Sequence, residues 1–343
     1  MYDYVIVTHI PVFYKINLYN ELAKKMNILV IFIAGNTSET RSDDFVTLSN
    51  SKFHYRLLYD GDIQDRGVKR NITKLQKILN HIQYRKLIVG GWDLLEYWYL
   101  VWTNHKRGNC LILESTINES TTIGAKGFMK KIFLSRISTV FASGNLHRKL
   151  LDALNYKGEI RITKGVGIIN KPKLNLIKRN YKKRFLFVGR LAKEKNIEML
   201  VNLFNDLEDY KLTIIGTGPL EKTLISKARE NIIFKGQVVN QNLKEYFETN
   251  DILILTSTAE PWGLVIEEAL YFGIPVMISS NCGSCVLIKE GVNGFIIDMN
   301  EMETLRENII SLDDEVYAKL LSGVSEFSIN EKDMEQLGVY FAK

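Results

Sequence analysis

Short apolar runs rich in β-branched and aromatic residues recur along the whole chain, and each is followed by a longer amphipathic or polar stretch. The first half contains YDYVIVT, NILVIFIA, KLIVGG, CLILES and STVFAS, and the second half contains RFLFVG, KLTIIG, NIIFKG, DILILTS, IPVMISS and GFIID. Strands buried on both faces have this continuous apolar character, and their alternation with helices builds parallel sheets. Two such sets predict an α/β protein with two doubly wound, Rossmann-like domains.

The pattern is interrupted once, over GVGIINKPKLNLIKRNYKKR at residues 165–184, where glycines, a proline and a basic run separate two strands. A length of 343 residues suits two domains. We expect a first domain over 1–170, a second over 171–325 and a tail over 326–343 that can pack back on the first domain. Ligands of parallel sheets bind beyond the carboxyl ends of the strands, so two such domains facing each other are expected to form a central cleft.

The composition is that of an ordinary globular protein, with 46% hydrophobic and 24% charged residues, and it excludes a disordered or fibrous chain. The opening MYDYVIVTHIPVF has no basic region before its short apolar run, which favours a first strand over a signal peptide. The most apolar stretches are too short for a bilayer or contain Asp93 and Glu96. A cytoplasmic protein is expected.

Three cysteines are too few and too unevenly spaced for a disulfide framework, which fits a reducing compartment. Cys282 and Cys285 form a CxxC in NCGSC, a pattern found in redox sites and in half of a zinc site. No second Cys or His pair lies nearby, so neither a metal nor a redox role is predicted.

The net charge is divided unevenly between the two halves. Residues 1–170 carry 24 Lys and Arg against 14 Asp and Glu, whereas the remaining residues have an excess of acids. The segment KGFMKKIFLSRI at 126–137 places bulky apolar side chains among the basic residues Lys126, Lys130, Lys131 and Arg136. Such a helix suits an anionic membrane surface, and several more basic residues lie within 66–86. The alternative is a core-packing helix with a solvated basic face. Nucleic acid is not expected, because no binding motif or set of stacking aromatics is present.

An anion site is indicated after the strand RFLFVG. The strand ends at Gly189, the loop carries Arg190 and Lys195, and a helix begins near Asn196. Free N–H groups, the helix dipole and two side-chain cations can then act on one anion. The alternative for such cations is solvated surface.

A second glycine-containing turn, IIGTGPLEKTL, ends a strand in Gly216 and Gly218 with Pro219 after it. It is a poor dinucleotide fingerprint, because Glu221 stands where the third glycine belongs. We predict a tight turn whose backbone approaches a ligand.

Two carboxylates, Glu260 and Glu268, lie in EPWGLVIEEALYFGIPV, with Pro261 in the first helical turn and Gly273 at the helix end. The apolar side chains of this helix are expected to pack while Glu267 and Glu268 face elsewhere. The structural alternative is that the acids only stabilise the helix dipole or lie in solvent.

Taken together, VGRLAKEKN, IIGTGPLE, FKGQV, DILILTSTAEPWGLVIEEALYFGIPV and GVNGFIID resemble the retaining glycosyltransferases of the GT-B fold in family 4, the glycosyl transferases group 1. The resemblance covers most of residues 184–298, and the N-terminal half matches in outline only. It implies that Arg190 and Lys195 bind the nucleotide diphosphate, that Glu268 binds the ribose and that Glu260 binds the donor sugar. Further nucleotide-sugar contacts are implied for Gly189, Gly216, Gly218, Gln237, Val238, Pro261, Trp262, Gly263 and Leu264.

The N-terminal half departs from many relatives, which carry a His where the strand CLILES ends in Glu114 and Ser115. Glu114 is therefore the candidate for the group beside the donor sugar, with Ser115 second. His9, Pro11 and Tyr14 follow the first strand, where acceptor contacts are expected, although His9 is equally suited to a structural role. The resemblance implies retention of configuration without an enzymic base, a cofactor or a metal.

The expected function is transfer of a sugar from a nucleoside diphosphate sugar, with UDP favoured, to a lipid-linked or glycan acceptor. The setting implied by the resemblance is cell-surface polysaccharide assembly, such as lipopolysaccharide, at the inner face of the membrane. The alternatives are a nucleotide-sugar epimerase of the same fold and a non-catalytic nucleotide-sugar-binding subunit.

Overall fold

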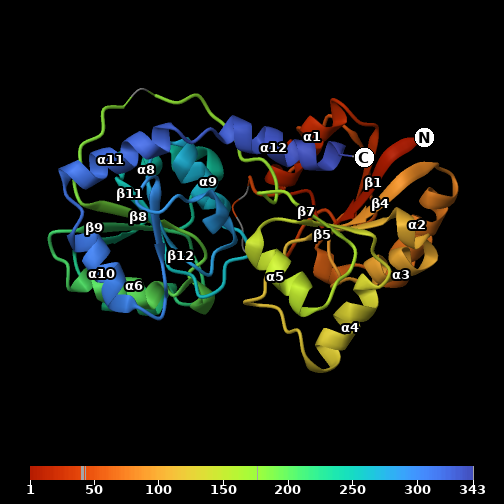
Figure 1. Cartoon of the computed structure of the whole chain (residues 1–343), viewed down its shortest axis with the longest axis horizontal. Helices are drawn as coiled ribbons and strands as arrows, with labels where there is room; N and C mark the ends of the chain where they lie inside the picture. The colour runs from red at the N-terminus through yellow and green to blue at the C-terminus, as the bar shows by residue number, and fades with distance from the viewer. Residues whose placement is uncertain (40–41, 43, 176, 343) are drawn as a thin grey trace. The chain divides into compact units, whose positions relative to one another are not determined.

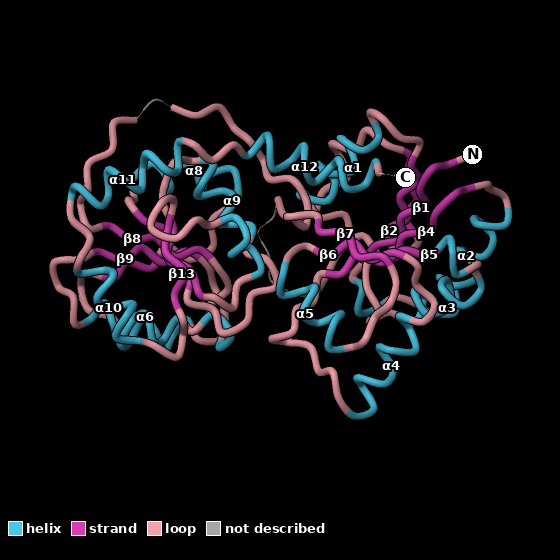
Figure 2. Tube along the Cα trace, viewed as in Figure 1, coloured by secondary structure: helices cyan, strands magenta, loops and turns pink. Residues whose placement is uncertain are grey.

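The computed structural model describes residues 1–39, 42, 44–175 and 177–342. The chain forms two compact units, Met1–Asn170 with Asp333–Lys343, and Lys171–Lys332. Within each unit the strands gather at the centre and helices lie on both sides (Figures 1 and 2). The prediction of an α/β protein with two parallel sheets is confirmed.

The N-terminal unit is built on a seven-stranded sheet in the order β3-β2-β1-β4-β5-β6-β7, with every neighbouring pair parallel. Its strands are β1 (Tyr2–Thr8), β2 (Ile28–Phe32), β3 (His54–Leu57), β4 (Tyr84–Val89), β5 (Asn109–Leu113), β6 (Thr139–Ala142) and β7 (Glu159–Ile162).

Helices cover both faces of this sheet because alternate residues of the inner strands point in opposite directions. Val5 and Val7 of β1 face a core that includes side chains of α2, α3, α4 and α5, whereas Tyr4 and Ile6 face one that includes α1 and Tyr340. The helices are α1 (Phe13–Ala23), α2 (Val68–Asn80), α3 (Leu95–Thr103), α4 (Gly124–Leu134), α5 (Asn145–Ala153) and α12 (Ile329–Phe341).

The edge strands β3 and β7 are the two that the apolar runs did not predict. All four residues of β3 and all four of β7 are exposed or only partly buried, whereas β2 and β5 are buried throughout. An edge strand is covered less and tolerates polar residues, so a search for continuous apolar runs finds the inner strands only.

The C-terminal unit has a six-stranded parallel sheet in the order β10-β9-β8-β11-β12-β13. Its strands are β8 (Arg184–Val188), β9 (Lys211–Ile215), β10 (Ile232–Phe234), β11 (Ile252–Leu255), β12 (Val276–Ser279) and β13 (Gly294–Ile297). Its helices are α6 (Ile197–Asn205), α7 (Glu221–Lys227), α8 (Leu243–Thr249), α9 (Leu264–Tyr271), α10 (Met302–Ile310) and α11 (Asp314–Ser325). Short 3-10 turns are η1 (Ile63–Asp65), η2 (Lys106–Gly108), η3 (Lys193–Lys195), η4 (Asn240–Asn242) and η5 (Gly283–Leu287).

Both sheets reverse their strand order beside the first strand of the unit. The reversal lies between β1 and β4 in the N-terminal unit and between β8 and β11 in the C-terminal unit. The loops after these strands separate there, so the carboxyl edge at a reversal is where a parallel sheet binds its ligand.

Helix α12 begins in the C-terminal unit and ends in the N-terminal unit, which contains its residues from Asp333 onward. The ring of Tyr340 stacks on Phe141 with centroids 4.5 Å apart, and its carbonyl accepts a hydrogen bond of 2.6 Å from the Tyr4 hydroxyl. Across the described residues, no helix combines the length and apolar character needed to cross a bilayer.

Candidate functional site

The loops after β8 and β11 meet at the carboxyl edge of the C-terminal sheet. The Thr258 N–H donates to the Glu194 carbonyl at 2.8 Å, and the Thr256 hydroxyl donates to the Lys195 carbonyl at 3.3 Å. These bonds hold a loop that carries two cations against a loop that leads into Glu260.

An ion pair joins the two loops, in which the Lys195 Nζ donates to the Glu260 Oε2. The side chains are only 17% and 12% exposed, so the charges meet away from bulk water but within reach of a ligand. A charge pair in such a setting interacts more strongly than one on the open surface. The structure therefore brings together two of the residues that the sequence proposed, although 64 residues separate them along the chain.

Arg190 belongs to the same loop but has a more open setting. Its guanidinium is 48% exposed and donates to the Glu194 Oε1 at 2.6 Å. Partial burial works to raise the pKa of Glu194, but backbone hydrogen bonds and Arg190 outweigh it and hold the pKa below its usual range. Arg190 can turn toward an anion at small cost, because exposed pairs of this kind contribute little stability.

The turn at Gly216 and Gly218 is tight, and its close backbone neighbour is the loop after β8. Gly216 has φ of +128°, and a Cβ there would lie 1.9 Å from the Gly189 carbonyl oxygen. A Cβ on Gly218 would lie 2.5 Å from the Leu191 carbonyl oxygen. The glycines thus let two loops of the site pack backbone to backbone. The sequence predicted a backbone that approaches a ligand, but not this contact between the loops.

The entrance to α9 also depends on a glycine. Gly263 has φ of +87°, and a Cβ there would lie 3.1 Å from the Cys282 Sγ and 3.3 Å from the Glu260 Cγ. The first N–H groups of a helix have no carbonyl partner within the helix. Half-buried Pro261 precedes this turn and half-buried Leu264 begins α9, so the N–H groups of 262–264 lie at the start of the helix that follows Glu260.

The segment after β12 fixes the Glu260 loop from the other side. The Gly283 N–H donates to the Glu260 carbonyl at 2.9 Å, and the Cys282 Sγ donates to the Trp262 carbonyl at 3.0 Å. Both cysteines of NCGSC are free thiols, and burial raises the pKa of Cys285 to about 11 and that of Cys282 further. These protonated thiols act as packing groups in this segment.

Glu268 lies within α9 and is 6% exposed. Its Oε1 accepts a hydrogen bond of 2.7 Å from the Asn240 Nδ2. Gln237 and Val238, just upstream of Asn240, line a hollow of about 510 Å³ with residues of α8. Asn240 was not predicted, and the structure shows that it positions Glu268 beside the Gln237 segment.

Glu267 is not a solvent-facing charge, which corrects the expectation that it faces away from the packed side of the helix. It is fully buried and accepts hydrogen bonds of 2.6 Å from the Trp262 Nε1 and of 2.6 Å from the Lys332 Nζ. Glu268 is likewise buried, whereas Leu264 and Val265 are only half-buried. A helix of eight residues with neighbours on several sides does not keep a simple polar face. Trp262 is near in sequence, but nothing in the sequence pointed to Lys332.

The reversal point of the N-terminal sheet also joins two loops, here through His9. The His9 Nε2 lies 2.9 Å from an Asp93 carboxylate oxygen, and its Nδ1 lies 3.1 Å from the hydroxyl of buried Tyr97. A carboxylate can only accept, so Nε2 carries a proton and donates it to Asp93. Partial burial works to raise the pKa of Asp93, but His9 outweighs it and holds that pKa below its usual value.

The other two acceptor candidates are packed against protein. Pro11 is buried and its carbonyl accepts from the Thr47 N–H at 2.9 Å. The ring of Tyr14 is half-buried and makes edge contacts with Phe13 and Phe45.

Glu114 and half-buried Ser115 directly follow β5, and the Glu114 Oε1 lies 2.7 Å from the Nζ of buried Lys15. Burial works to lower the pKa of Lys15, but Glu114 outweighs it and raises that pKa. Burial lowers the pKa of His147 to about 4, and Glu114 offsets only part of this effect. Lys15 and His147 were not predicted; both are buried, whereas the Glu114 side chain beside Lys15 is 32% exposed.

Comparison with known proteins places the similarity mainly in the C-terminal unit. Residues 171–319 match the family described as glycosyl transferases group 1. The O-antigen biosynthesis glycosyltransferase WbnH of Escherichia coli is 31% identical over 186 residues, which cover 51% of this chain and 53% of the relative. An uncharacterized 41.2 kDa protein in the cps region of Klebsiella pneumoniae is 27% identical over 191 residues, covering 52% and 53%. The chain spans about half or less of the length of the curated relatives that it matches.

Solved structures with the same fold extend over the whole chain. The apo lipopolysaccharide outer core galactosyltransferase WaaB has a TM-score of 0.72 at 16% identity, covering 99% of each chain. Anabaena Alr3699/HepE with UDP and glucose has a TM-score of 0.72 at 14% identity, covering 100% of each. The fold is therefore GT-B, and the predicted resemblance to glycosyl transferases group 1 is confirmed.

Proposed function

We propose that this chain, which resembles the glycosyl transferases group 1 and matches them over residues 171–319, transfers a sugar from a nucleoside diphosphate sugar, with UDP favoured, to a lipid-linked or glycan acceptor in cell-surface polysaccharide assembly. The observation that carries the proposal is the Lys195–Glu260 ion pair at the reversal of the C-terminal sheet. A cation and a sugar-binding acid meet where the fold binds its ligand.

The cations act on the leaving group. Departure of a nucleoside diphosphate increases negative charge on a phosphate oxygen, and Lys195 with Arg190 stabilises that charge without a metal. The N–H groups at the start of α9 add donors of fixed direction. Because Glu260 already holds Lys195 in place, little of the lysine's side-chain freedom has to be lost when the donor binds.

The two acids bind different parts of the donor. Glu268, held by Asn240, accepts hydrogen bonds from the two ribose hydroxyls, and the Gln237 segment contacts the base. Glu260 accepts from hydroxyls of the sugar. Glu260 lies just before α9 and Glu268 lies within it, so the start of this helix sets the distance between ribose and sugar.

Retention follows from attack of the acceptor hydroxyl on the face that the diphosphate leaves, through a transition state that resembles an oxocarbenium ion. The leaving phosphate takes the proton of the acceptor, so no side chain is assigned as a base. The Glu114 carboxylate, paired with Lys15, is the group that we propose to stabilise the developing positive charge. His9 is the candidate for contact with the acceptor.

The choice of donor nucleotide rests on similar proteins, because the site alone does not distinguish UDP from GDP. HepE was solved with UDP and glucose, whereas an α-mannosyltransferase of Corynebacterium glutamicum, 34% identical over 120 residues, is GDP-mannose-dependent. We favour UDP and test both. The purified protein is screened against UDP-, GDP- and dTDP-sugars by thermal shift and by release of the diphosphate.

Three outcomes separate the candidate functions. Stabilisation by one donor with transfer to a glycan acceptor supports the glycosyltransferase. Interconversion of the nucleotide sugar without an acceptor supports the epimerase instead. Binding without any turnover supports a non-catalytic subunit.

The acceptor side is proposed to lie at the cytoplasmic face of the membrane, with α4 as the contact. Ile123, Phe128 and Met129 are 78%, 64% and 47% exposed. Lys126 and Lys131 are exposed beside them, which suits insertion between anionic headgroups. Lys130 instead donates to the Ser120 hydroxyl and the Thr121 carbonyl, and Arg136 donates to carbonyls of 101 and 104. These two basic residues of the segment therefore support the fold rather than the membrane contact.

Vesicle sedimentation tests the membrane contact. Lys126→Gln with Lys131→Gln and, separately, Phe128→Ser are expected to reduce binding to vesicles that contain phosphatidylglycerol, since the first removes charge and the second removes inserted apolar surface. Lys149→Gln, on another exposed helix face, is the control. Unchanged sedimentation of both variants would contradict α4 as the contact.

A further inference from the structure

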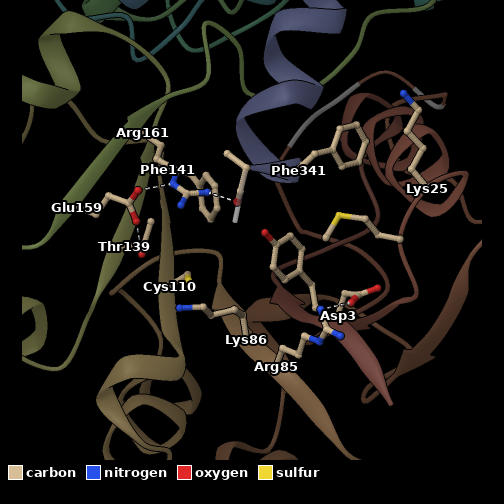
Figure 3. Close-up of a pocket in the computed structure, with 13 residues that line it drawn as sticks. Asp3, Lys25, Arg85, Lys86, Cys110, Thr139, Phe141, Glu159, Arg161 and Phe341 are labelled. Carbon is tan, nitrogen blue, oxygen red and sulfur yellow. Dashed lines mark hydrogen bonds and ion pairs between the residues drawn. The ribbon is translucent and has the colours of Figure 1, made fainter.

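Positive charge gathers in two places of the N-terminal unit outside its reversal point. The first is a pocket of about 770 Å³ at the edge of the sheet where the strands begin (Figure 3). Arg161 there pairs with Glu159 at 2.8 Å, and Lys25 and Lys86 lie at opposite ends of the pocket. A single anion therefore cannot contact these cations together.

The second place surrounds helices α3 and α4. Lys106 and Arg107 follow the end of α3, and Lys126 and Lys131 belong to α4. All four residues are exposed, and none of them makes an ion pair within the part of the chain that the structure describes. Cations spread over two helices suit a broad anionic surface, because each can meet a different phosphate.

The acidic residues of the same stretch, 92–137, do not neutralise these cations, because each acid has another partner. The partners are His9 for Asp93, Arg66 for Glu96, Lys15 for Glu114 and Thr116 for Glu119. Glu96 is in addition fully buried. The surface around α3 and α4 thus has an excess of positive charge that complements an anionic partner.

Helix α3, which packs beside α2 (Figure 1), turns an apolar and aromatic face to solvent. Its buried side consists of Glu96, Tyr97, Leu100 and Val101. On the other side Leu95 and Trp102, about two turns apart, are 64% and 50% exposed, and half-buried Trp98 and Tyr99 lie between them. A surface helix ordinarily has polar residues on the side away from the core, so this face has the composition of a contact surface.

Two basic residues of the α4 segment lie over tryptophans of this region. The Arg136 Cζ lies 5.2 Å from the centroid of the Trp102 ring, and the Lys130 Nζ lies 5.4 Å from that of Trp92. The Trp98 ring packs edge-on against α4, and its Nε1 donates to the Trp92 carbonyl at 2.8 Å. Cation–π contacts of this length orient the indole rings. The three tryptophans of the N-terminal unit therefore lie together where α3 meets α4.

We propose that the outer face of α3 is a second contact with an anionic bilayer, in which Leu95, Tyr99 and Trp102 enter the interface and Lys106 and Arg107 meet lipid phosphates. Tryptophan and tyrosine gather at the level of the headgroups in membrane proteins, because their rings are apolar and carry one polar group. This contact rests on the proposed membrane setting and extends it from α4 to α3.

The position of α3 bears on the acceptor. Asp93 lies two residues before the start of this helix and holds His9, the candidate for contact with the acceptor. A bilayer at the outer face of α3 therefore lies near the place where the acceptor hydroxyl is expected. The contact favours a lipid-linked acceptor over a free glycan.

Sedimentation of the full chain with vesicles that contain phosphatidylglycerol tests the contact. Leu95→Ser with Trp102→Ser is expected to weaken binding at least about tenfold, because two exposed apolar side chains no longer leave water. Trp102→Phe keeps an apolar ring and should bind within about threefold of the parent. The matched control is Ile225→Ser with Ile310→Ser, which changes apolar residues of the C-terminal unit that are 50% and 46% exposed, and it should leave binding unchanged.

Tryptophan emission gives a second readout, since Trp102 is exposed whereas Trp92 and Trp98 are half-buried and Trp262 is buried. With vesicles that carry brominated acyl chains, quenching of the parent is expected to be at least about twice that of Trp102→Phe. Equal quenching of the two proteins would overturn insertion of Trp102.

The charged part of the contact has its own test. Lys106→Gln with Arg107→Gln should weaken binding to the phosphatidylglycerol vesicles at least about fivefold. The parent should bind vesicles of phosphatidylcholine alone at least about tenfold more weakly. Equal binding to the two kinds of vesicle would overturn the anionic partner.

Two further results would overturn the α3 contact as a whole. One is equal sedimentation of the parent and of Leu95→Ser with Trp102→Ser. The other is a dimer of the parent that this double variant loses, which would assign the face to a second copy of the chain. None of these measurements uses a sugar donor, so a failure here is distinct from a failure of the transfer reaction, which release of the diphosphate tests.

Discussion

The two reversal points of this molecule share one geometry and differ in chemistry. In the N-terminal unit, His9 in the loop after β1 pairs with Asp93 in the loop after β4. In the C-terminal unit, Lys195 in the loop after β8 pairs with Glu260 in the loop after β11. The first pair is 27% and 56% exposed, and the second is 17% and 12% exposed. The same scaffold thus holds an accessible imidazole–carboxylate pair in one unit and a sheltered ammonium–carboxylate pair in the other.

This difference matches the division of labour that we propose. A nucleoside diphosphate needs positive charge at every physiological pH, which a lysine held by a carboxylate supplies. An acceptor hydroxyl needs only orientation, which an imidazole held by Asp93 and Tyr97 can give. All five histidines of the chain lie in the N-terminal half, at 9, 54, 81, 105 and 147.

Lys195→Ala should produce the largest effect on the comparison. Loss of the cation is expected to lower the transfer rate by about 10³-fold, because the charge on the leaving phosphate loses its fixed partner. Lys193→Ala, an exposed neighbour in the same 3-10 turn, should stay within about twofold of the parent rate. A folded K195A protein with full activity would show that the C-terminal reversal point does not use this cation to stabilise the leaving phosphate.

Lys332→Met probes how firmly the Glu260 loop is held. It leaves the buried Glu267 carboxylate without its cation and is expected to cost about 3 kcal/mol in urea unfolding. Lys227→Met removes the cation of an exposed pair with Glu198 and should cost less than about 0.5 kcal/mol. Similar costs for the two variants would show that the Glu267 network does not stabilise the site.

Mild acid should weaken the N-terminal unit selectively. Burial lowers the pKa of His147 to about 4, whereas a histidine in the unfolded chain has a pKa near 6.5. Between these two values the unfolded chain binds a proton at His147 and the folded chain does not. This contribution to stability is complete above pH 6.5 and falls by about 2 kcal/mol by pH 5.

The measurement is urea unfolding at pH 7 and pH 5, in a Trp262→Phe background so that tryptophan emission reports Trp92, Trp98 and Trp102 of the N-terminal unit. His147→Leu cannot take up the proton and should lose most of the difference between the two pH values. An equal difference in both proteins would assign the acid sensitivity to other groups.

His9→Asn should have the smallest effect. The change keeps a hydrogen-bonding side chain but loses the imidazole held by Asp93 and Tyr97, and kcat/KM for the acceptor is expected to fall about tenfold. The Kd for the donor nucleotide should not change. A weakened donor Kd with an unaffected acceptor KM would place His9 on the other substrate.

Much of the C-terminal site could be predicted because its residues lie in the loops and helix starts that follow recognisable apolar strands. Lys195 and Glu260 each lie in the loop after an apolar strand, so the carboxyl-edge rule already places them on one side of the sheet. Asp93 was visible only as a charge inside an apolar stretch, and its partner His9 lies 84 positions away. The pairs Lys15–Glu114 and Lys332–Glu267 could not be predicted from the sequence, because each depends on which helix covers which face of the sheet.

The two parallel sheets follow from the amino-acid pattern, since continuous apolar runs between helical stretches are buried on both faces when the strands pair in parallel under helices. The edge strands β3 and β7 were not predicted, because solvent reaches them and their residues need not be apolar. Which charges meet depends on the folded arrangement of the strands and loops. Strand order selects the two loops that face each other at a reversal, and a buried ion is stable only where that order brings a partner within hydrogen-bonding distance.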